Sequence, residues 1–149
     1  MIRNATHDDL GAIVLMASKF YETTSYAKWA DFCPVSVENL AAMMIDTGVM
    51  LVAEVEGRVV GMCGLVVAPF MFNNAKTAAY EVVWWVEPEA QGIGAGKALL
   101  AAIDGACKAK GCATVQMVHL HNSPPQAAAL YERMGYAHTE SSYTKRLEP

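Results

Sequence analysis

The stretch that decides the fold is Val86-Glu87-Pro88-Glu89-Ala90-Gln91-Gly92-Ile93-Gly94-Ala95-Gly96-Lys97-Ala98-Leu99, in which three glycines separate an apolar run from a helical pattern. Glycine lets the backbone turn tightly and approach a ligand without a side chain in the way. The first N–H groups of a helix have no partner inside the helix, and the helix dipole favours negative charge there. The stretch therefore predicts a phosphate-binding loop of main-chain amides, to which Lys97 adds one cation. The alternative is a glycine-rich turn without a ligand.

Two common phosphate-loop motifs do not fit these residues. A Walker A loop fails because Gln91 stands where its first glycine belongs and Ala98 replaces the Ser or Thr that would hold Mg²⁺. A dinucleotide fingerprint fails because the glycines alternate instead of following G-x-G-x-x-G, and the expected downstream acidic residue is missing. A nucleotide-binding α/β domain remains as a weaker alternative.

The rest of the chain alternates between the apolar periods of strands and helices, which predicts a single α/β or α+β domain over residues 1–149. A hairpin is expected at Glu56-Gly57, and a capping pattern at residues 6–9 predicts a helix start. Other helices are expected to begin at Ser36, Gly94 and Pro125. The predicted strands are residues 2–5, 49–55, 58–67, 77–86, 113–120 and 136–146.

Two motifs in register resemble the GNAT superfamily of N-acetyltransferases. Gln91-Gly92-Ile93-Gly94-Ala95-Gly96 is similar to the family's [QR]-x-x-G-x-[GA] loop, and Trp84-Trp85-Val86-Glu87-Pro88 resembles the strand before it. Ala128-Ala129-Leu130-Tyr131-Glu132-Arg133-Met134-Gly135-Tyr136 resembles the family's A-x-x-L-Y-x-x-x-G-F helix. The resemblance covers almost the whole chain. It implies a mostly antiparallel, twisted sheet of about six to seven strands, splayed in the middle and flanked by about four helices.

The resemblance also implies acetyl-CoA as the acetyl donor, with no metal. The loop would hold its pyrophosphate, the strand edge before the loop would pair with the pantetheine arm, and a backbone N–H near Val86 would polarise the thioester carbonyl. Pro124 stands where many members have an Asn, and Gln91 where many have an Arg, so main-chain amides must supply more of the binding. The implied cofactor-binding residues are Trp84, Trp85, Val86, Gln91, Gly92, Ile93, Gly94, Ala95, Gly96, Lys97 and Ala128.

Tyr131 and Glu81 are the catalytic candidates. Transfer needs a base for the attacking amine and an acid for the departing thiolate. Tyr131, the motif tyrosine, is protonated at neutral pH and suits the acid role. Glu81 lies in an otherwise apolar strand, where burial would raise its pKa and suit it as the base. The alternatives are a core aromatic for Tyr131, and a solvent-facing carboxylate or ordered water in place of Glu81.

Composition limits the classes of partner. A net charge of -4 argues against a general nucleic-acid binder, and 54% hydrophobic residues argue against disorder. No apolar run approaches the ~20 residues of a membrane span, and the first residues lack a signal-peptide pattern. The four cysteines form no C-x-x-C pair, which favours free thiols in the cytoplasm over a disulfide or metal site. His119 and His121 are expected to share one strand face near the acceptor site, with a proton-relay role or metal binding as the alternatives.

The resemblance, together with the catalytic candidates, implies an N-acetyltransferase that moves an acetyl group from acetyl-CoA to a primary amine by direct attack in a ternary complex. The alternative is a non-catalytic module of the same fold that binds or senses acyl-CoA. The acceptor is expected to contact residues 21–35 and 69–75, and their composition fits small amines, antibiotics and peptide termini alike. The apolar content also suggests a homodimer.

Overall fold

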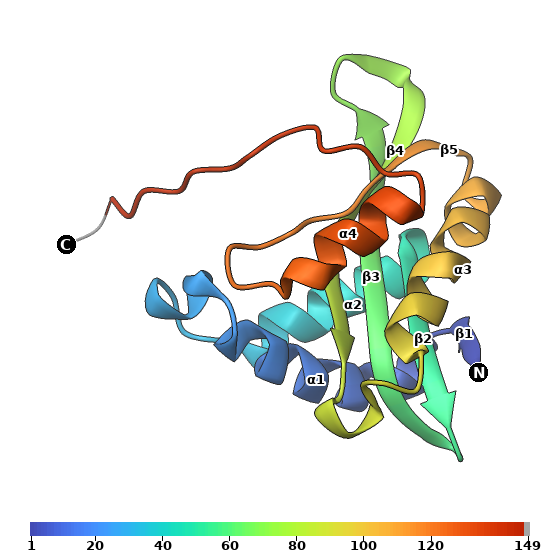
Figure 1. Cartoon of the computed structure of the whole chain (residues 1–149), viewed down its shortest axis with the longest axis vertical. Coiled ribbons are helices and arrows are strands. Elements are labelled where there is room, and N and C mark those ends of the chain that lie inside the picture. Colours follow the sequence, from blue (N-terminus) through green and yellow to red (C-terminus); the bar gives the residue numbers. More distant parts are fainter. Residues whose placement is uncertain (148–149) are drawn as a thin grey trace.

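A five-stranded sheet in the order β1-β2-β3-β4-β5 forms the centre of the computed structural model, which describes residues 1–147 (Figure 1). The first three pairings are antiparallel and the last, between β4 and β5, is parallel. The sheet is therefore mixed and mostly antiparallel, as expected. The strands are β1 (Ile2–Asn4), β2 (Val49–Val55), β3 (Arg58–Phe70), β4 (Asn73–Val86) and β5 (Cys112–Gln116).

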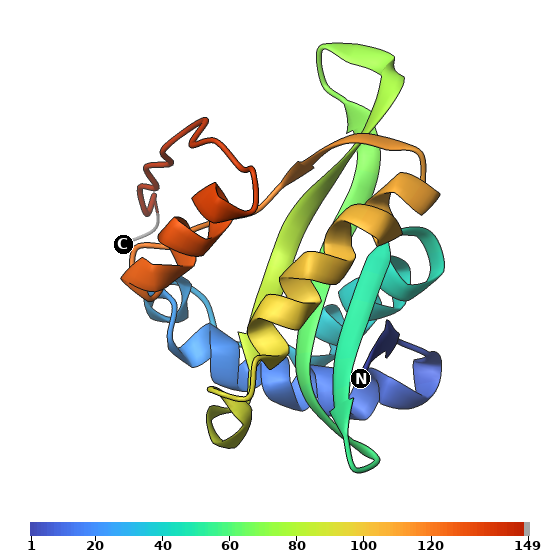
Figure 2. The ribbon, with the colours of Figure 1, turned by 45° about the vertical axis from the view of Figure 1, so that its right-hand side comes forward.

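Helices cover both faces of this sheet (Figure 2). Ile13, Met16 and Met44 from the first two helices pack on one face, whereas Leu99 and Ile103 from the third pack on the other. Each face buries an apolar cluster, so the sheet is the middle layer of three. The helices are α1 (Leu10–Glu22), α2 (Pro34–Thr47), α3 (Ala95–Ala109) and α4 (Pro125–Arg133), with short 3-10 turns η1 (His7–Asp9), η2 (Ser25–Lys28) and η3 (Pro88–Ala90).

The predicted last strand does not form, so the expected count of six to seven strands is wrong for the part of the chain described. Residues 136–146 follow α4 as a segment without regular secondary structure that runs away from the sheet (Figure 1). Residues 137–142 are mostly polar or small, and Tyr143 is 97% exposed, so this segment has no apolar face to bury. One contact ties it to the sheet, from Gln116 Nε2 to Glu140 Oε1 at 3.2 Å.

Several predicted boundaries also move. The strand predicted at 113–120 ends at Gln116, so His119 and His121 lie beyond it and do not share a strand face. The second helix begins at Pro34 instead of being capped by Ser36, because proline's fixed φ suits the first helical position. β3 passes through Pro69, since its β2 side is unpaired beyond Leu65 and a missing N–H costs nothing there.

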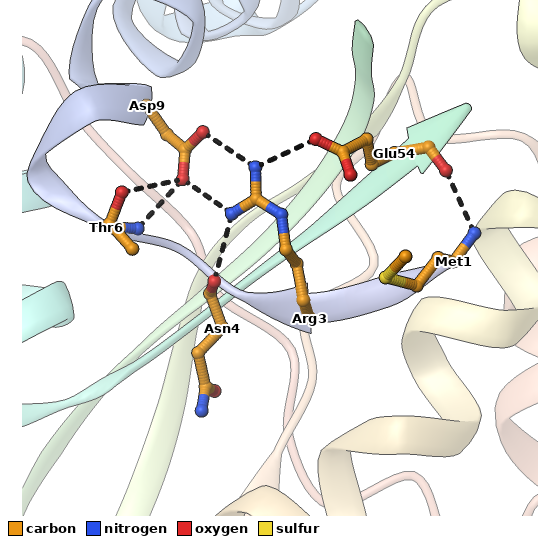
Figure 3. Close-up of polar contacts among 6 residues, drawn as sticks. All are labelled: Met1, Arg3, Asn4, Thr6, Asp9 and Glu54. Atoms are coloured by element: carbon orange, nitrogen blue, oxygen red, sulfur yellow. Dashed lines mark hydrogen bonds and ion pairs between the residues drawn. The ribbon is translucent and has the colours of Figure 1, made fainter. Parts of the chain in front are cut away.

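The capping pattern at residues 6–9 is confirmed and is tied to two strands by Arg3 (Figure 3). Asp9 accepts hydrogen bonds from the Thr6 main-chain N–H at 2.8 Å and from Arg3 Nη1 at 2.8 Å. Arg3 Nη2 reaches Glu54 Oε1 on β2 at 3.2 Å. Asp9 is only 8% exposed, so Arg3 compensates a buried carboxylate and fixes the start of α1 against β1 and β2.

Three global observations complete the fold. No helix among residues 1–147 is both long and apolar enough to cross a membrane. The four cysteines are free thiols, of which Cys63 and Cys107 are buried. No group of three His, Cys, Asp or Glu side chains gathers to hold a metal ion in the described part of the chain.

Candidate active site

A cavity of about 1150 Å³ brings the two sequence motifs together. The predicted site residues that line it are Glu81, Trp84, Trp85, Val86, Gln91, Gly92, Gly94, Ala95, Gly96, Lys97 and Tyr131. Ile93 lines a separate cavity of about 220 Å³ beside Met1 and Ile2, and Ala128 lines neither cavity. Every predicted site residue except these two therefore faces one space.

The cavity opens where β4 and β5 separate. Their parallel pairing ends at Tyr80 and Gln116. Residues 81–86 of β4 continue without a strand partner on the β5 side among residues 1–147, and all six line the cavity. Figure 2 shows the chain after β5 diverging toward α4. A free strand edge at a cavity offers N–H and C=O groups that an extended, amide-containing ligand can pair with.

A β-bulge at Val82 sets the direction of Glu81. Cys63 pairs with Trp84 and Gly64 with Val83, but Leu65 pairs with Glu81, so β4 has one residue more than β3 at this point. Cross-strand partners share a face. Glu81 therefore lies on the same face as Leu65 and Cys63, which pack under α3. Without the extra residue, Glu81 would follow Val83 to the face covered by α1 and α2.

Glu81 and Tyr131 meet at the backbone of Val118. The Val118 N–H donates to Glu81 Oε1 at 3.4 Å, and the Tyr131 hydroxyl donates to the Val118 carbonyl at 3.0 Å. Burial raises the pKa of Glu81 to about 7. Burial, followed by the negative charge of Glu81, raises the pKa of Tyr131 well above its usual 10. A proton acceptor and a protonated hydroxyl are thus hydrogen-bonded to the backbone of the same residue.

The glycine loop presents main-chain N–H groups to the same cavity. Gly92 and Gly94 have φ values of +90° and +88°, a region that side chains disfavour, and α3 begins directly after them. The N–H groups of Gly92, Ile93 and Gly94 have no acceptor among residues 1–147. The first N–H groups of α3 add to this set. The predicted phosphate-binding loop therefore has main-chain N–H groups that are free to bind an anion, which we name the anion cradle, and Lys97 is exposed beside them.

The two tryptophans before the loop, Trp84 and Trp85, pack on opposite faces of the sheet, each against one of the two core clusters. Trp85 packs on the α1 side and donates from Nε1 to Glu87 Oε1 at 2.9 Å. Lys19 of α1 holds the other Glu87 oxygen at 2.6 Å. Trp84 stacks 5.6 Å from Tyr131 between ring centroids. These contacts fix the end of β4 between α1 and α4, and with it the entrance to the loop.

Sequence reasoning missed part of the cavity. Val118 binds Glu81 and Tyr131 through its backbone, which no side-chain pattern identifies. The sequence predicts residues 69–75 near the acceptor, but they form the tip of the β3–β4 hairpin and do not line the cavity. Asn122 does line it, and its Nδ2 donates to the Thr23 carbonyl at 3.2 Å, which links the loop after β5 to the end of α1.

Comparisons with known proteins agree with this arrangement. The chain is 23% identical to an acetyltransferase from Trypanosoma brucei, with a TM-score of 0.73 over 99% of both chains. It is 18% identical to a ribosomal-protein-alanine N-acetyltransferase from Brucella melitensis, with a TM-score of 0.75 over 99% of both. It is 14% identical to a predicted acetyltransferase from Clostridium acetobutylicum, crystallised with acetyl-CoA, with a TM-score of 0.74 over 99% of this chain and 96% of that one. These similarities show the fold.

The family follows from the sequence match. The model of the acetyltransferase (GNAT) family matches residues 14–136, from α1 through the glycine loop and α4. Both motifs quoted above lie inside this range. The chain belongs to the acetyltransferase (GNAT) family.

Proposed function

We propose that this protein transfers the acetyl group of acetyl-CoA to a primary amine by direct attack in a ternary complex. The observation that carries the proposal is the meeting of Glu81 and Tyr131 at Val118, beside an unpaired strand edge that leads to an anion cradle. Glu81 and Tyr131 suit proton transfer, and the strand edge with the anion cradle suits a phosphorylated, amide-containing acetyl donor. The Clostridium acetobutylicum neighbour with acetyl-CoA has the same fold.

The cradle and the strand edge suit the two ends of the donor. The N–H groups of residues 92–94 and of the first turn of α3 would donate to the pyrophosphate. Residues 81–86 would pair with the pantetheine amides. They span about 17 Å at roughly 3.3 Å per residue. The thioester therefore belongs at the end of this segment that carries the Val82 bulge, next to Glu81. A main-chain N–H at the bulge is then better placed than the N–H of Val86 to polarise the thioester carbonyl.

Glu81 is the base of the proposed reaction. An alkyl ammonium must lose a proton before its nitrogen can attack, and a carboxylate with a pKa of about 7 accepts that proton at neutral pH, directly or through water. The nitrogen then forms a bond to the thioester carbon, and the C–S bond breaks. The alkyl ammonium gives up two protons in becoming a neutral amide, the first to Glu81 before the attack and the second from the nitrogen after it. One balances the proton taken by the sulfur, and the other leaves to solvent.

Tyr131 is the proposed acid. Its raised pKa keeps the hydroxyl protonated throughout the working pH range. Rotation about the C–O bond would turn this proton from the Val118 carbonyl toward the departing sulfur. The tyrosine then regains a proton released by the amide nitrogen. The Tyr131 ring lies against Trp84, so packing as well as the hydrogen bond to Val118 holds the Tyr131 hydroxyl in place.

An acetylation assay tests this function. Binding of acetyl-CoA is measured by calorimetry, and free CoA thiol is followed with a panel of primary amines. We expect Tyr131→Phe to bind acetyl-CoA normally and to lose about 10²-fold or more in kcat. Tyr143→Phe in the exposed C-terminal segment is the matched control and should retain the wild-type rate. Binding without transfer to any amine would instead identify the non-catalytic acyl-CoA module, and absence of binding would refute both.

A further inference from the structure

The cavity has two chemically different ends. One end holds the glycine loop and Lys97. The other, which we name the aromatic end, lies between α1, η2 and α2 and is lined by Phe20, Tyr21, Tyr26, Phe32, Val37 and Leu40. We propose that the acceptor is a primary monoamine carried on an aromatic or branched alkyl group, and that the aromatic end holds this group. The proposal rests on the acetyltransferase function above and specifies its acceptor.

The walls of the aromatic end are fixed by polar and ring contacts within the chain. The Tyr21 hydroxyl lies within hydrogen-bond distance of the carbonyls of Tyr26 and Ala30, at 2.9 and 2.5 Å, and its one proton can bind either of them, which ties the loop after α1 back onto the helix. The Tyr21 and Phe32 rings lie 5.7 Å apart between centroids. A site that is already formed loses little freedom on binding, so its apolar contacts contribute more fully to affinity.

The aromatic end and the proposed catalytic groups lie on opposite sides of β4, and one cavity connects them past the end of β4 that is not paired with β5. The Phe20 ring meets Trp85 of β4 edge to face, with centroids 6.4 Å apart. The bond from Asn122 to Thr23 ties the segment after Val118 to the end of α1. Glu81, Tyr131 and the aromatic side chains line one continuous space. An amine nitrogen beside Glu81 can therefore carry an apolar substituent that reaches toward Phe32 and Leu40.

The charges of the cavity favour a single amino group. Among its described lining residues only Glu81 and Asp31 carry carboxylates, and Asp31 is exposed. A polyamine or an aminocyclitol antibiotic carries several ammonium groups, and Glu81 and the exposed Asp31 could pair with two of them at most, so any further ammonium group would lose solvation without a carboxylate partner in this cavity. An apolar group, by contrast, gains by leaving water for a surface of aromatic and aliphatic side chains. Monoamines with such a group are therefore favoured over polycations.

A set of matched amines tests the proposal in the free-thiol assay. The set is 2-phenylethylamine, 3-methylbutylamine, ethylamine, spermidine and a pentapeptide with a free N-terminus. We expect kcat/KM for 2-phenylethylamine to exceed those for ethylamine and spermidine at least 100-fold, since one methylene in an apolar pocket already changes the rate constant by about 10-fold or more. Equal rates, or preference for spermidine or the peptide, would overturn the acceptor class while leaving acetyl transfer intact. Loss of acetyl-CoA binding would refute the underlying function.

Variants of the aromatic end provide the second arm of the test. Phe32→Ala should lower kcat/KM at least 10-fold for 2-phenylethylamine and less than 2-fold for ethylamine, with the KM for acetyl-CoA unchanged. Phe72→Ala is the matched control, because Phe72 is 84% exposed at the hairpin tip. If Phe32→Ala does not fold, Phe32→Leu replaces it in the test. This variant keeps an apolar side chain, and its kcat/KM for 2-phenylethylamine should fall about threefold. An equal loss for both amines would contradict the assignment.

Discussion

Replacing Glu81 with Gln tests the environment on which the proposed mechanism depends. In the folded protein the pKa of the Glu81 carboxyl is about 7, whereas its ordinary value is 4.5. Between these values the folded state binds a proton that the unfolded chain has released, so the free energy of unfolding falls as pH rises. At about 1.4 kcal/mol per pKa unit, this group removes about 3 kcal/mol of stability between pH 4.5 and pH 8. The glutamine side chain of the Glu81→Gln variant has no proton to lose, and its amide oxygen can still accept from the Val118 N–H.

The assay is urea unfolding at pH 4.5, 6, 7 and 8.5 for the wild type and Glu81→Gln. We expect the difference in the free energy of unfolding to shift by about 3 kcal/mol in favour of the variant as pH rises. The control is Glu38→Gln, at an exposed position of α2 outside the cavity. Its free energy of unfolding should change with pH in parallel with that of the wild type. Parallel curves for Glu81→Gln would refute the raised pKa. In the acetylation assay, the pH profile of the wild-type kcat/KM should show a break near pH 7 that comes from Glu81, and this break should be absent from the profile of Glu81→Gln.

Further predictions concern the loop, the core and the N-terminal ion pairs. Gly94→Ala should lower the free energy of unfolding by about 1 kcal/mol because φ is +88°, and should weaken acetyl-CoA binding in calorimetry. Gly96→Ala adds a Cβ 3.5 Å from the nearest side-chain atom, an ordinary contact, so its thermal midpoint should stay within 2–3 °C of the wild type (roughly 0.5 kcal/mol). Leu99→Ala, at a fully buried position under the sheet, should cost about 3 kcal/mol in urea unfolding. Arg3→Ala should cost about 2 kcal/mol at pH 7 by leaving Asp9 buried and unpaired. Arg3 lowers the pKa of Asp9, so this loss should shrink as pH falls below 3.8, and an unchanged loss at pH 2.5 would contradict the ion pair.

The elements that the sequence predicted well are those with strong local patterns. α3 shows a helical stripe that includes Leu99 and Ile103, and it begins within one residue of the predicted start at Gly94. The hairpin at Glu56-Gly57 forms with positive φ at both residues. In each case the information lies within a few neighbouring residues, as apolar period or turn chemistry.

The last predicted strand shows where local pattern was insufficient. A strand needs a partner edge and an apolar face. β5 stops at Gln116, and residues 137–142 offer few large side chains for burial. The same shortening of β5 removed the shared strand face expected for His119 and His121. Strand pairing joins residues far apart in the chain, so a single segment cannot specify its own partner.

The sequence by itself determined the glycine loop, the two motif segments and the candidate pair Glu81 and Tyr131, because these depend on residue type and short spacing. Only the tertiary structure decided that an additional residue at Val82 turns Glu81 toward Tyr131, that the Val118 backbone joins them, and that α1, η2 and α2 close an aromatic end on the same cavity. These features arise from the register between strands and from packing of distant helices. They depend on how far each strand pairs before it separates from its neighbour, which the order of residues in one segment does not encode.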